Sequence, residues 1–411
     1  MKIAHVTQDD SNGGASLAAY RLHQGMLAKG LDSTFFVKYK SRMAANVVEA
    51  NLQLNLRQKI RRKWLNKRNL TFDLVNSGDN PHLLYSIYSP YDRLHEELAG
   101  FDVINFHWIS GFIDLPSLFK GLSSQQKVVW TLHDTAAITG ACHYFHHCSE
   151  YTKQCGSCYQ IHSEEKVGLS HQSWLRKKHF YQSLSQNQLS FVTPSQWLKN
   201  CASASSLTKN ITTYHIPNGI NTEEFRPLEI DIRESRKCLG ISEAKIVLLI
   251  IQKGEQELYN ALEKLDSKEQ IIVLEMGAPT RKIHNLVETI NLGTITSFEL
   301  KRLVYNLADV FVLPSPIDNY PNTLLESFGC ATPALASSVG GIPEIVKDQE
   351  RGWLYDFYSQ TELPQKLEAL SDMKDQFYTL GQNCRQWVMG NTTIELQAER
   401  YQSLYQELLK N

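Results

Sequence analysis

Residues 308–315 read ADVFVLPS and residues 316–329 follow as PIDNYPNTLLESFG. The first string is a short apolar run that ends in Pro and Ser, which predicts a buried strand followed by a turn. Pro321 can open a helix, because the first turn of a helix needs no backbone donor at that position. The stretch therefore predicts a strand, a polar loop and a helix, which is the repeating unit of a parallel sheet.

The same alternation extends in both directions from this stretch. A chain of 411 residues is too long for one ordinary core. We expect an α/β fold with two doubly wound parallel sheets, divided into an N-terminal domain (1–222), a C-terminal domain (223–390) and a final polar helix (391–411). The expected strands are 2–6, 35–37, 103–106, 128–132, 190–193, 213–216, 246–251, 271–274, 310–313 and 334–336.

Ligands of doubly wound sheets bind at the carboxyl ends of the strands, so the loop after residue 313 is a candidate site. The backbone amides of Asn322, Thr323 and Leu324 would form the positive end of a helix, which suits a phosphate. A carboxylate one turn further in, at Glu326, could accept hydrogen bonds from ribose hydroxyls. Gly340 and Gly341 permit close backbone approach to a ligand.

These C-terminal strings resemble retaining GT-B glycosyltransferases of glycosyltransferase family 4. That family carries Glu-x7-Glu and Gly-Gly-x-Pro-Glu, and this chain has Asp318-x7-Glu326 and a matching string at 340–344. The resemblance implies two Rossmann-like domains that face each other across a cleft, with the C-terminal helix returning to the N-terminal domain. It also implies that Glu326 holds the ribose and that Asp318 faces the transferred sugar, where the family usually has Glu.

A second departure concerns the loop after residues 246–251. The family usually places an Arg and a Lys there, whereas this strand runs directly into Gln252, Lys253 and Gly254. Lys253 is the remaining candidate for neutralising the leaving diphosphate, and the loss of one of two cations would weaken that stabilisation. The other interpretation is that Lys253 is an ordinary solvated lysine.

The N-terminal half has strings of its own at the ends of expected strands. Residues 102–109 (DVINFHWI), 127–134 (KVVWTLHD) and 139–144 (TGACHY) resemble a polysaccharide-building branch of the same family. The resemblance places His133 against the transferred sugar, where a neutral imidazole can donate to a hydroxyl. Gly13 and Gly14 match a glycine turn near the donor phosphates, or simply form a tight turn. His107 would contact the acceptor or pack against Trp108.

Four cysteines follow the His133 loop: Cys142, Cys148, Cys155 and Cys158. Cys-x2-Cys is typical of zinc sites, and four thiolates could close a structural tetrahedral site. Packing thiols or redox pairs are the alternative. The resemblance implies no cofactor or metal for catalysis itself.

Residues 56–68 combine an apolar stripe with a run of positive charge. Leu56, Ile60 and Trp64 recur every four residues, and a basic amphipathic helix of this kind suits an anionic membrane surface. The alternative is a solvated helix whose stripe packs on the core. The basic residues are Arg57, Lys59, Arg61, Arg62, Lys63, Lys67 and Arg68.

Together the residues and the resemblance predict a hexosyltransferase that retains the anomeric configuration. The donor would be a UDP- or GDP-linked sugar, and the acceptor a lipid-linked saccharide in bacterial surface polysaccharide biosynthesis. The alternatives are a nucleotide-sugar epimerase and a non-catalytic partner protein with the GT-B fold. A formal net charge of -1 argues against nucleic acid as a ligand. The sequence has no evident signal peptide and no apolar run of membrane-spanning length, so we expect a cytoplasmic protein that reaches the inner face of the membrane.

Overall fold

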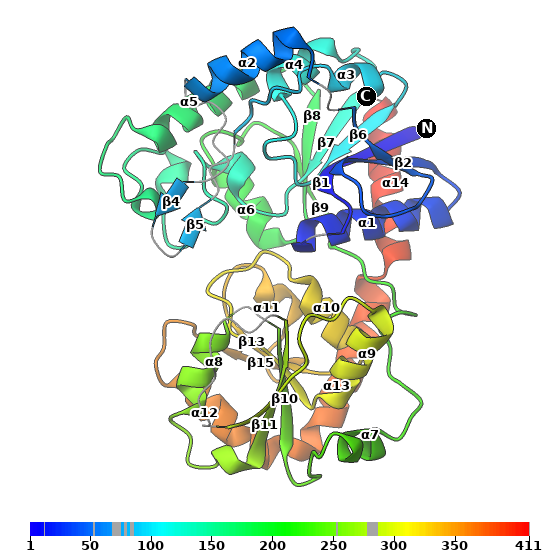
Figure 1. Cartoon of the computed structure of the whole chain (residues 1–411), viewed down its shortest axis with the longest axis vertical. Helices are drawn as coiled ribbons and strands as arrows, with labels where there is room; N and C mark the ends of the chain where they lie inside the picture. Colours follow the sequence, from blue (N-terminus) through cyan, green and yellow to red (C-terminus); the bar gives the residue numbers. More distant parts are fainter. Residues whose placement is uncertain are drawn as a thin grey trace. The chain divides into compact units, whose positions relative to one another are not determined.

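The structure, a computed structural model, describes residues 1–11, 13–51, 54–67, 75–77, 80–82, 86–251, 254–277 and 287–410. The chain divides into two compact units (Figure 1). Unit 1 comprises Met1–Pro217 and Ile394–Asn411, and unit 2 comprises Asn218–Thr393. The boundaries predicted from the sequence, after 222 and after 390, lie a few residues from these divisions.

Unit 1 is built on a seven-stranded parallel sheet with the order β3-β2-β1-β6-β7-β8-β9. The order reverses between β1 and β6, so the loops after these two strands meet at a topological switch point. The strands are β1 (Lys2–Asp9), β2 (Asp32–Tyr39), β3 (Val47–Glu49), β6 (Val103–Phe106), β7 (Lys127–Thr131), β8 (Leu189–Thr193) and β9 (Thr213–His215).

Helices cover both faces of this sheet. Alternate strand residues point to opposite faces, so Ile3 and Val103 pack toward α1 and α14, while Ala4 and Ile104 pack toward the helices on the other face. The helices are α1 (Gly13–Ala28), α2 (Leu56–Lys67), α3 (Leu94–Glu97), α4 (Leu115–Gly121), α5 (Leu169–Gln182), α6 (Gln196–Ala204) and α14 (Ile394–Lys410). Short 3-10 turns occur at η1 (Ala136–Ile138), η2 (Glu150–Thr152) and η3 (Tyr159–Ile161), and β4 (Val75–Ser77) pairs antiparallel with β5 (Asn80–His82).

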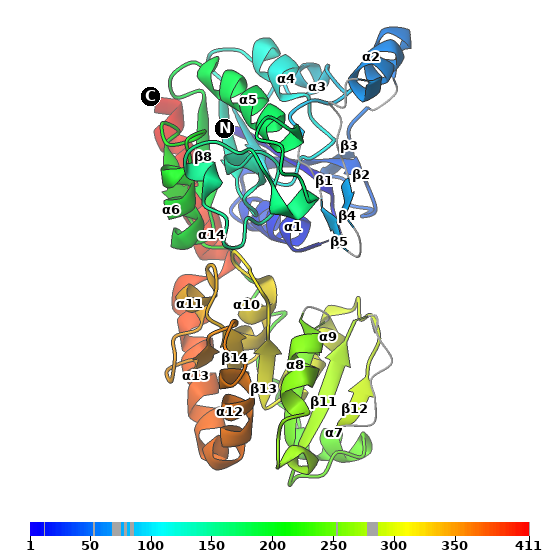
Figure 2. The ribbon, with the colours of Figure 1, turned by 90° about the vertical axis from the view of Figure 1, so that its left-hand side faces the viewer.

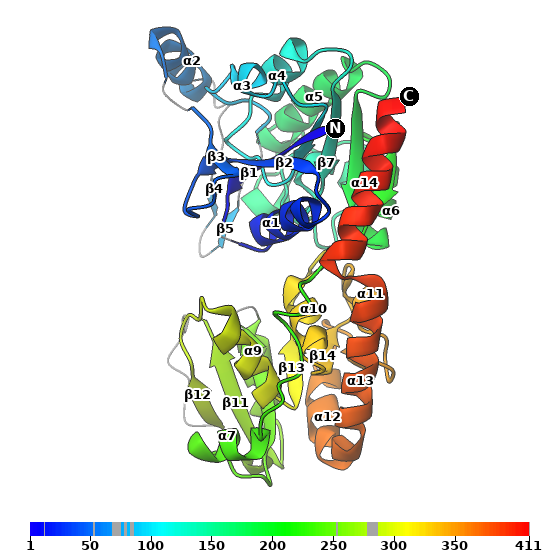
Figure 3. The same ribbon diagram turned by 90° about the vertical axis from the view of Figure 1, so that its right-hand side faces the viewer.

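The C-terminal helix α14 belongs to unit 1, where it runs beside α1 (Figure 3). A methyl group on Gly25 of α1 would lie 2.8 Å from the carbonyl oxygen of Ile394, so the two helices approach closely. Buried hydroxyls tie α14 to the sheet: Asn105 Nδ2 donates to Tyr405 Oη at 2.7 Å, and Thr131 Oγ1 lies 2.9 Å from Tyr401 Oη. The C-terminal residues are therefore an integral layer of unit 1.

Unit 2 contains a six-stranded parallel sheet with the order β12-β11-β10-β13-β14-β15. Its order reverses between β10 and β13, which again marks the switch point at which α/β sheets bind ligands. The strands are β10 (Ile246–Ile251), β11 (Ile271–Met276), β12 (Glu288–Asn291), β13 (Val310–Leu313), β14 (Ala334–Ser337) and β15 (Gly352–Tyr355).

The helices of unit 2 also lie in two layers. Val247 and Phe311 face the layer with α9 and α10, whereas Leu248 and Val312 face the layer with α8 and α12 (Figure 2). The helices are α7 (Ile232–Cys238), α8 (Glu255–Leu262), α9 (Phe298–Leu307), α10 (Asn322–Gly329), α11 (Ile342–Ile345), α12 (Glu362–Ala369) and α13 (Lys374–Asn391), with 3-10 turns η4 (Lys268–Gln270) and η5 (Leu370–Met373).

The predicted fold class is confirmed: each unit is a Rossmann-like parallel sheet with helices on both faces. All ten expected strands form, although β1 and β2 extend beyond their apolar runs. The sequence analysis missed β3, β12 and β15 of the two parallel sheets and the short antiparallel pair β4 and β5. In β3 only Val47 is buried, and β12 has no buried residue, so edge strands such as these carry little apolar signal. Across the described ranges, every helix is too short or too polar to span a bilayer.

Candidate functional site

In unit 2, three loops converge at the carboxyl ends of β10, β13 and β14. Gly254 has a φ of +85°, and a methyl group on it would lie 2.1 Å from the carbonyl oxygen of Pro314. The hydroxyl of Ser337 donates to the carbonyl of Ser315 at 2.6 Å. The loop that follows β13 is therefore braced from both neighbouring strands, at the edge of the sheet where ligands of this fold bind.

The glycine pair after β14 braces the same loop further along. Gly341 N donates to the carbonyl of Asp318 at 3.0 Å, and a methyl group on Gly340 would lie 1.9 Å from that oxygen. Gly340 also has a φ of +57°, which glycine adopts without strain. The sequence analysis assigned these glycines to a ligand; the close approach in the structure is to the backbone of Asp318. The pair fixes the course of the Asp318 loop.

Helix α10 carries the predicted ribose carboxylate. Pro321 occupies the cap position with a φ of −66°, so the helix begins at Asn322. Glu326 lies in the second turn with only 4% of its surface exposed, and it accepts a hydrogen bond from the Tyr305 hydroxyl of α9 at 3.0 Å. A buried carboxylate held in this way is a rigid hydrogen-bond acceptor, because the tyrosine hydroxyl fixes the position of Oε2.

The three backbone amides predicted to bind phosphate are not equivalent in the first turn of α10. The amide of Leu324 donates to the carbonyl of Pro321 at 3.2 Å, and its side chain is fully buried. Leu324 therefore suits the predicted phosphate contact less well than Asn322 and Thr323, which are half-buried. The predicted Lys253 lies outside the described residues.

In unit 1, the carboxyl ends of β1, β6 and β7 bring together a row of histidines. His5 Nδ1 lies 3.2 Å from His107 Nε2, and His107 Nδ1 lies 3.1 Å from His133 Nε2. The rings of His107 and His133 stack with centroids 5.4 Å apart. His5 belongs to β1, His107 directly follows β6, and His133 lies two residues after the end of β7. The parallel sheet itself therefore sets their spacing. We call His5, His107 and His133 the histidine row.

Burial keeps these imidazoles neutral. Desolvation lowers the pKa of His133 to about 4, and it lowers the pKa of His5 and His107 well below the usual value. Each neutral ring has one N–H and one acceptor nitrogen, so the two hydrogen bonds must run in the same direction along the row. The direction decides which nitrogen of His133 carries its proton.

The buried end of the row favours one direction. His5 Nε2 is buried and has no hydrogen-bond partner among the residues that the structure describes. An orphaned acceptor is tolerated better than an orphaned N–H, so we assign the protons to Nδ1 of each ring. His133 then accepts at Nε2 and can donate from Nδ1. His107 uses both ring nitrogens within the row and is 3% exposed, which favours a packing role over contact with the acceptor. The neighbouring Trp108 stacks on His143, with ring centroids 4.5 Å apart.

The loop that follows His133 is held by a buried lysine of α5. Lys177 Nζ donates to the carbonyls of Ala136, Thr139 and Gly140 at 2.6, 3.0 and 3.0 Å. Burial lowers the pKa of Lys177 to about 8, but its three acceptors remain good partners for the ammonium. At the start of the loop, Asp134 Oδ2 lies 2.9 Å from His143 Nδ1. The backbone around His133 is therefore fixed from two sides.

The predicted glycine turn after β1 is also present in unit 1. Helix α1 begins at Gly13, and Gly13 has a φ of +78°. Gly13 and Gly14 therefore form the first turn of α1 at the switch point of the sheet. Contact between these glycines and donor phosphates stays a prediction.

The four cysteines of the predicted zinc site lie in the loops between η1 and α5 as free thiols. Cys142 donates to the sulfur of Cys158, and this contact raises the pKa of Cys142 and lowers that of Cys158. Cys155 instead accepts from Gly140 N at 3.0 Å. No three His, Cys, Asp or Glu side chains in the described ranges form a metal-binding group, and the structural zinc stays a prediction that also involves Cys148.

The sequence analysis missed two of the residues that shape this site. His5 looked like a strand residue, and a lone His within an apolar run gives no signal of its own. Lys177 lies between Arg176 and Lys178 in a polar helix, so its burial could not be foreseen from charge alone. Both could have been found by asking which polar residues fall on the buried face of an element.

Comparison with known proteins finds its family match within the C-terminal unit. Residues 248–387 match the family model Glycosyl transferases group 1. A protein of Escherichia coli K12 named as a colanic acid biosynthesis glycosyl transferase, WcaC, is 24% identical over 348 residues, which cover 82% of this chain and 83% of that protein. The N,N'-diacetylbacillosaminyl-diphospho-undecaprenol alpha-1,3-N-acetylgalactosaminyltransferase of Campylobacter jejuni is 25% identical over 204 residues, which cover 47% of this chain and 54% of that enzyme.

Solved structures agree on the fold over the full length. Anabaena HepE in complex with UDP-glucose aligns with a TM-score of 0.66 at 14% identity and covers 99% of this chain and 100% of its own. WaaG, a glycosyltransferase involved in lipopolysaccharide biosynthesis, aligns with a TM-score of 0.64 at 13% identity over 97% and 98% of the two chains. The chain therefore has the GT-B fold, carries a glycosyl transferases group 1 domain and is homologous to GT-B glycosyltransferases.

Proposed function

We propose that this protein is a retaining glycosyltransferase of family 4 that moves a hexose from a nucleotide diphosphate sugar to a lipid-linked saccharide in surface polysaccharide biosynthesis. The observation that carries the proposal is the braced loop and helix at the unit 2 switch point, with Asp318 in the loop and the buried Glu326 in α10. This arrangement lies within the span of the group 1 match, and a relative named for transfer to a diphospho-undecaprenol-linked sugar supports the acceptor class.

Each predicted residue has a defined part in donor binding. The Glu326 carboxylate, oriented by the Tyr305 hydroxyl, would accept hydrogen bonds from the ribose hydroxyls. The amides of Asn322 and Thr323 would face the diphosphate, where the positive end of α10 favours negative charge. UDP is the first nucleotide to test, because HepE was solved with UDP-glucose; GDP remains the alternative.

His133 and Asp318 would act on the transferred sugar. A His133 imidazole with a pKa of about 4 is neutral near pH 7, so it can donate from Nδ1 to a sugar hydroxyl without adding positive charge beside an oxocarbenium-like transition state. Asp318 would stabilise that positive charge, with a reach one methylene shorter than the family's usual Glu. Lys253 would help to neutralise the leaving diphosphate.

The bond changes follow from retention. The bond between the anomeric carbon and the diphosphate oxygen breaks, and the acceptor oxygen bonds to the same face of that carbon. The proton of the acceptor hydroxyl passes to an oxygen of the leaving diphosphate. This route needs no protein base and no metal.

The test is transfer from UDP- and GDP-linked hexoses to diphospho-undecaprenol saccharides, with the anomeric configuration of the product read by NMR. We expect the configuration of the donor to be kept, and an inverted product would overturn the mechanism. An epimer formed from donor alone would instead establish an epimerase. Nucleotide binding without transfer, in both the wild type and Asp318→Glu, would establish a non-catalytic partner protein.

A further inference from the structure

Helix α2 turns its apolar stripe away from unit 1. Leu56, Ile60 and Trp64 are 76%, 61% and 48% exposed, whereas Gln58 and Leu65 on the opposite side are 7% and 1% exposed. A surface helix of a globular protein normally buries its apolar face, and α2 has the reverse orientation. The alternative raised by the sequence, a stripe packed on the core, is therefore wrong.

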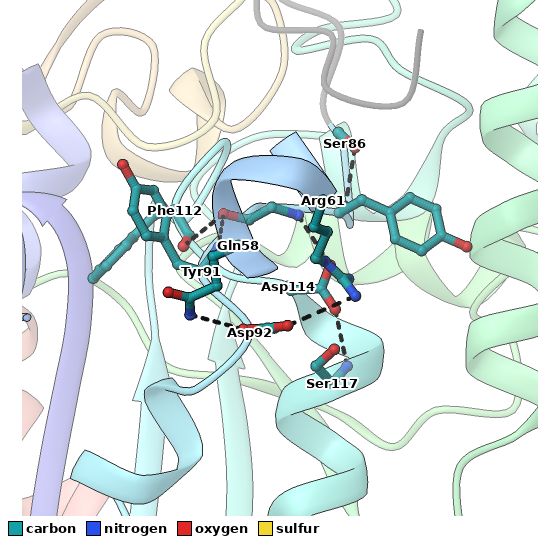
Figure 4. A network of polar contacts seen from close by, with 10 residues as sticks. Gln58, Arg61, Ser86, Tyr91, Asp92, Phe112, Asp114 and Ser117 are labelled. Atoms are coloured by element: carbon teal, nitrogen blue, oxygen red, sulfur yellow. Dashed lines mark hydrogen bonds and ion pairs between the residues drawn. The ribbon is translucent and has the colours of Figure 1, made fainter. Parts of the chain in front are cut away.

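Polar contacts fix this orientation (Figure 4). Gln58 Nε2 donates to Asp92 Oδ1 at 2.9 Å, and Arg61 pairs with Asp114 at 2.6 Å and with Asp92 at 3.8 Å. The Asp114 side chain is fully buried and also accepts from Ser117 N at 3.0 Å, where it caps α4. Rotating α2 to bury its stripe would leave that buried carboxylate without its cation, which is strongly unfavourable.

Positive charge surrounds the exposed stripe. Helix α2 contains no Asp or Glu, and Arg61 is the only one of its basic residues that pairs inward with a carboxylate in an ion pair among the described residues. The chain as a whole has a formal net charge of -1, so this is a local concentration of charge. The other basic residues of the helix are all exposed: Arg57, Lys59, Arg62, Lys63 and Lys67. Arg68, which the sequence analysis added to the run, lies outside the described residues.

We propose that the outer face of α2, defined by Leu56, Ile60, Trp64 and the exposed basic residues around them, docks on an anionic phospholipid surface. Lys and Arg attract anionic headgroups, while an exposed stripe with Trp enters the interface between headgroups and acyl chains. A nucleic acid or an acidic protein would match the positive charge of this face, but neither would account for its exposed Leu56 and Ile60 side chains as well as a lipid interface does. The inference goes beyond sugar transfer and does not depend on it.

The experiment is flotation of the full chain with phosphatidylcholine vesicles that do or do not contain phosphatidylglycerol. We expect binding to the anionic vesicles alone, with release as the salt concentration rises. The triple variant Arg57→Gln, Lys59→Gln, Lys63→Gln should lower the partition coefficient about a hundredfold, since each cation at an anionic surface contributes roughly a factor of five.

The matched control changes three exposed lysines elsewhere in unit 1: Lys29→Gln, Lys120→Gln and Lys153→Gln. This variant carries the same net charge and should bind the vesicles within about twofold of the wild type. Equal losses in the two triple variants would overturn the proposal, because they would show only an effect of total charge. No binding to anionic vesicles at low salt would overturn it as well.

Insertion of the stripe is tested by fluorescence. Vesicles with brominated acyl chains should quench part of the tryptophan emission of the wild type, and Trp64→Phe should abolish most of that quenching while vesicle binding persists. Quenching that survives in Trp64→Phe would show that another tryptophan enters the bilayer, and binding without any quenching would show that the stripe does not insert. Either result would overturn docking through the outer face of α2. Nucleotide-sugar binding enters none of these measurements, so a failed docking and a failed transferase proposal remain distinct.

Discussion

Acidification should destabilise unit 1 through its buried histidines. His23 and His133 have pKa values of about 4 in the fold against the ordinary 6.5, because burial disfavours the charged ring. Below pH 6.5 the two histidines bind protons in the unfolded chain but stay neutral in the folded chain. The free energy of unfolding therefore falls as the pH falls from 6.5 toward 4. Between pH 7 and pH 5 each ring should cost about 1.8 kcal/mol, or roughly 3.6 kcal/mol together. His5 and His107 add a loss of the same sign.

The assay is urea unfolding of the full chain at the two pH values, followed by tryptophan fluorescence. Trp130 and Trp174 are buried in unit 1 and report its transition. In His23→Gln the side chain that meets Ser33 Oγ at 2.7 Å remains polar but no longer titrates, so the acid-induced loss should shrink by about 1.8 kcal/mol. The exposed His147→Gln serves as the control. A loss below about 1 kcal/mol in the wild type, or an unchanged loss in His23→Gln, would refute the reasoning.

Four further substitutions, one of them a control, test how the residues of the candidate sites are held. Gly340→Ala combines strain at a φ of +57° with a backbone clash and should cost unit 2 about 3 kcal/mol by calorimetry. Gly240→Ala, with a φ of +74° but no described atom within 4 Å of the new methyl, should cost only about 1 kcal/mol. Lys177→Met leaves three carbonyls without their donor and should lower the unfolding free energy by about 3 kcal/mol in urea; a loss under 1 kcal/mol would contradict its bracing role. Tyr305→Phe frees the carboxylate it orients and should weaken UDP binding about fivefold by titration calorimetry, and unchanged affinity would show that the hydroxyl has no such part.

The sheet strands were predictable from the sequence because parallel strands are buried on both faces. A run such as residues 246–251 is apolar at every position, and its bounds match β10. The missed edge strand β12 lacks that signal, because its residues are exposed or half-buried. Strand order could not be predicted either, since it depends on contacts between distant segments. The switch points became visible only with the sheet order.

The candidate site was predictable where loop position alone decides it. His133, Asp318 and Glu326 all follow expected strands. The histidine row was not predictable, because it needs the register of β1 against β6, in which His5 lies opposite Asn105. The orientation of α2 was not predictable from its hydrophobic pattern, since an apolar stripe normally predicts the buried face. There the ion pair to a buried carboxylate, Asp114, decides the outcome.

The most direct measurement is the melting temperature of the chain with a panel of nucleotides and their sugars. Binding of a ligand to the folded chain alone raises stability, so UDP or GDP should raise the melting temperature and UMP or GMP should not. Glu326→Gln should remove most of that shift, whereas the exposed Glu263→Gln in the same unit should keep it. An equal shift in both variants, or no shift with any nucleoside diphosphate, would contradict the account of α10 as the donor site.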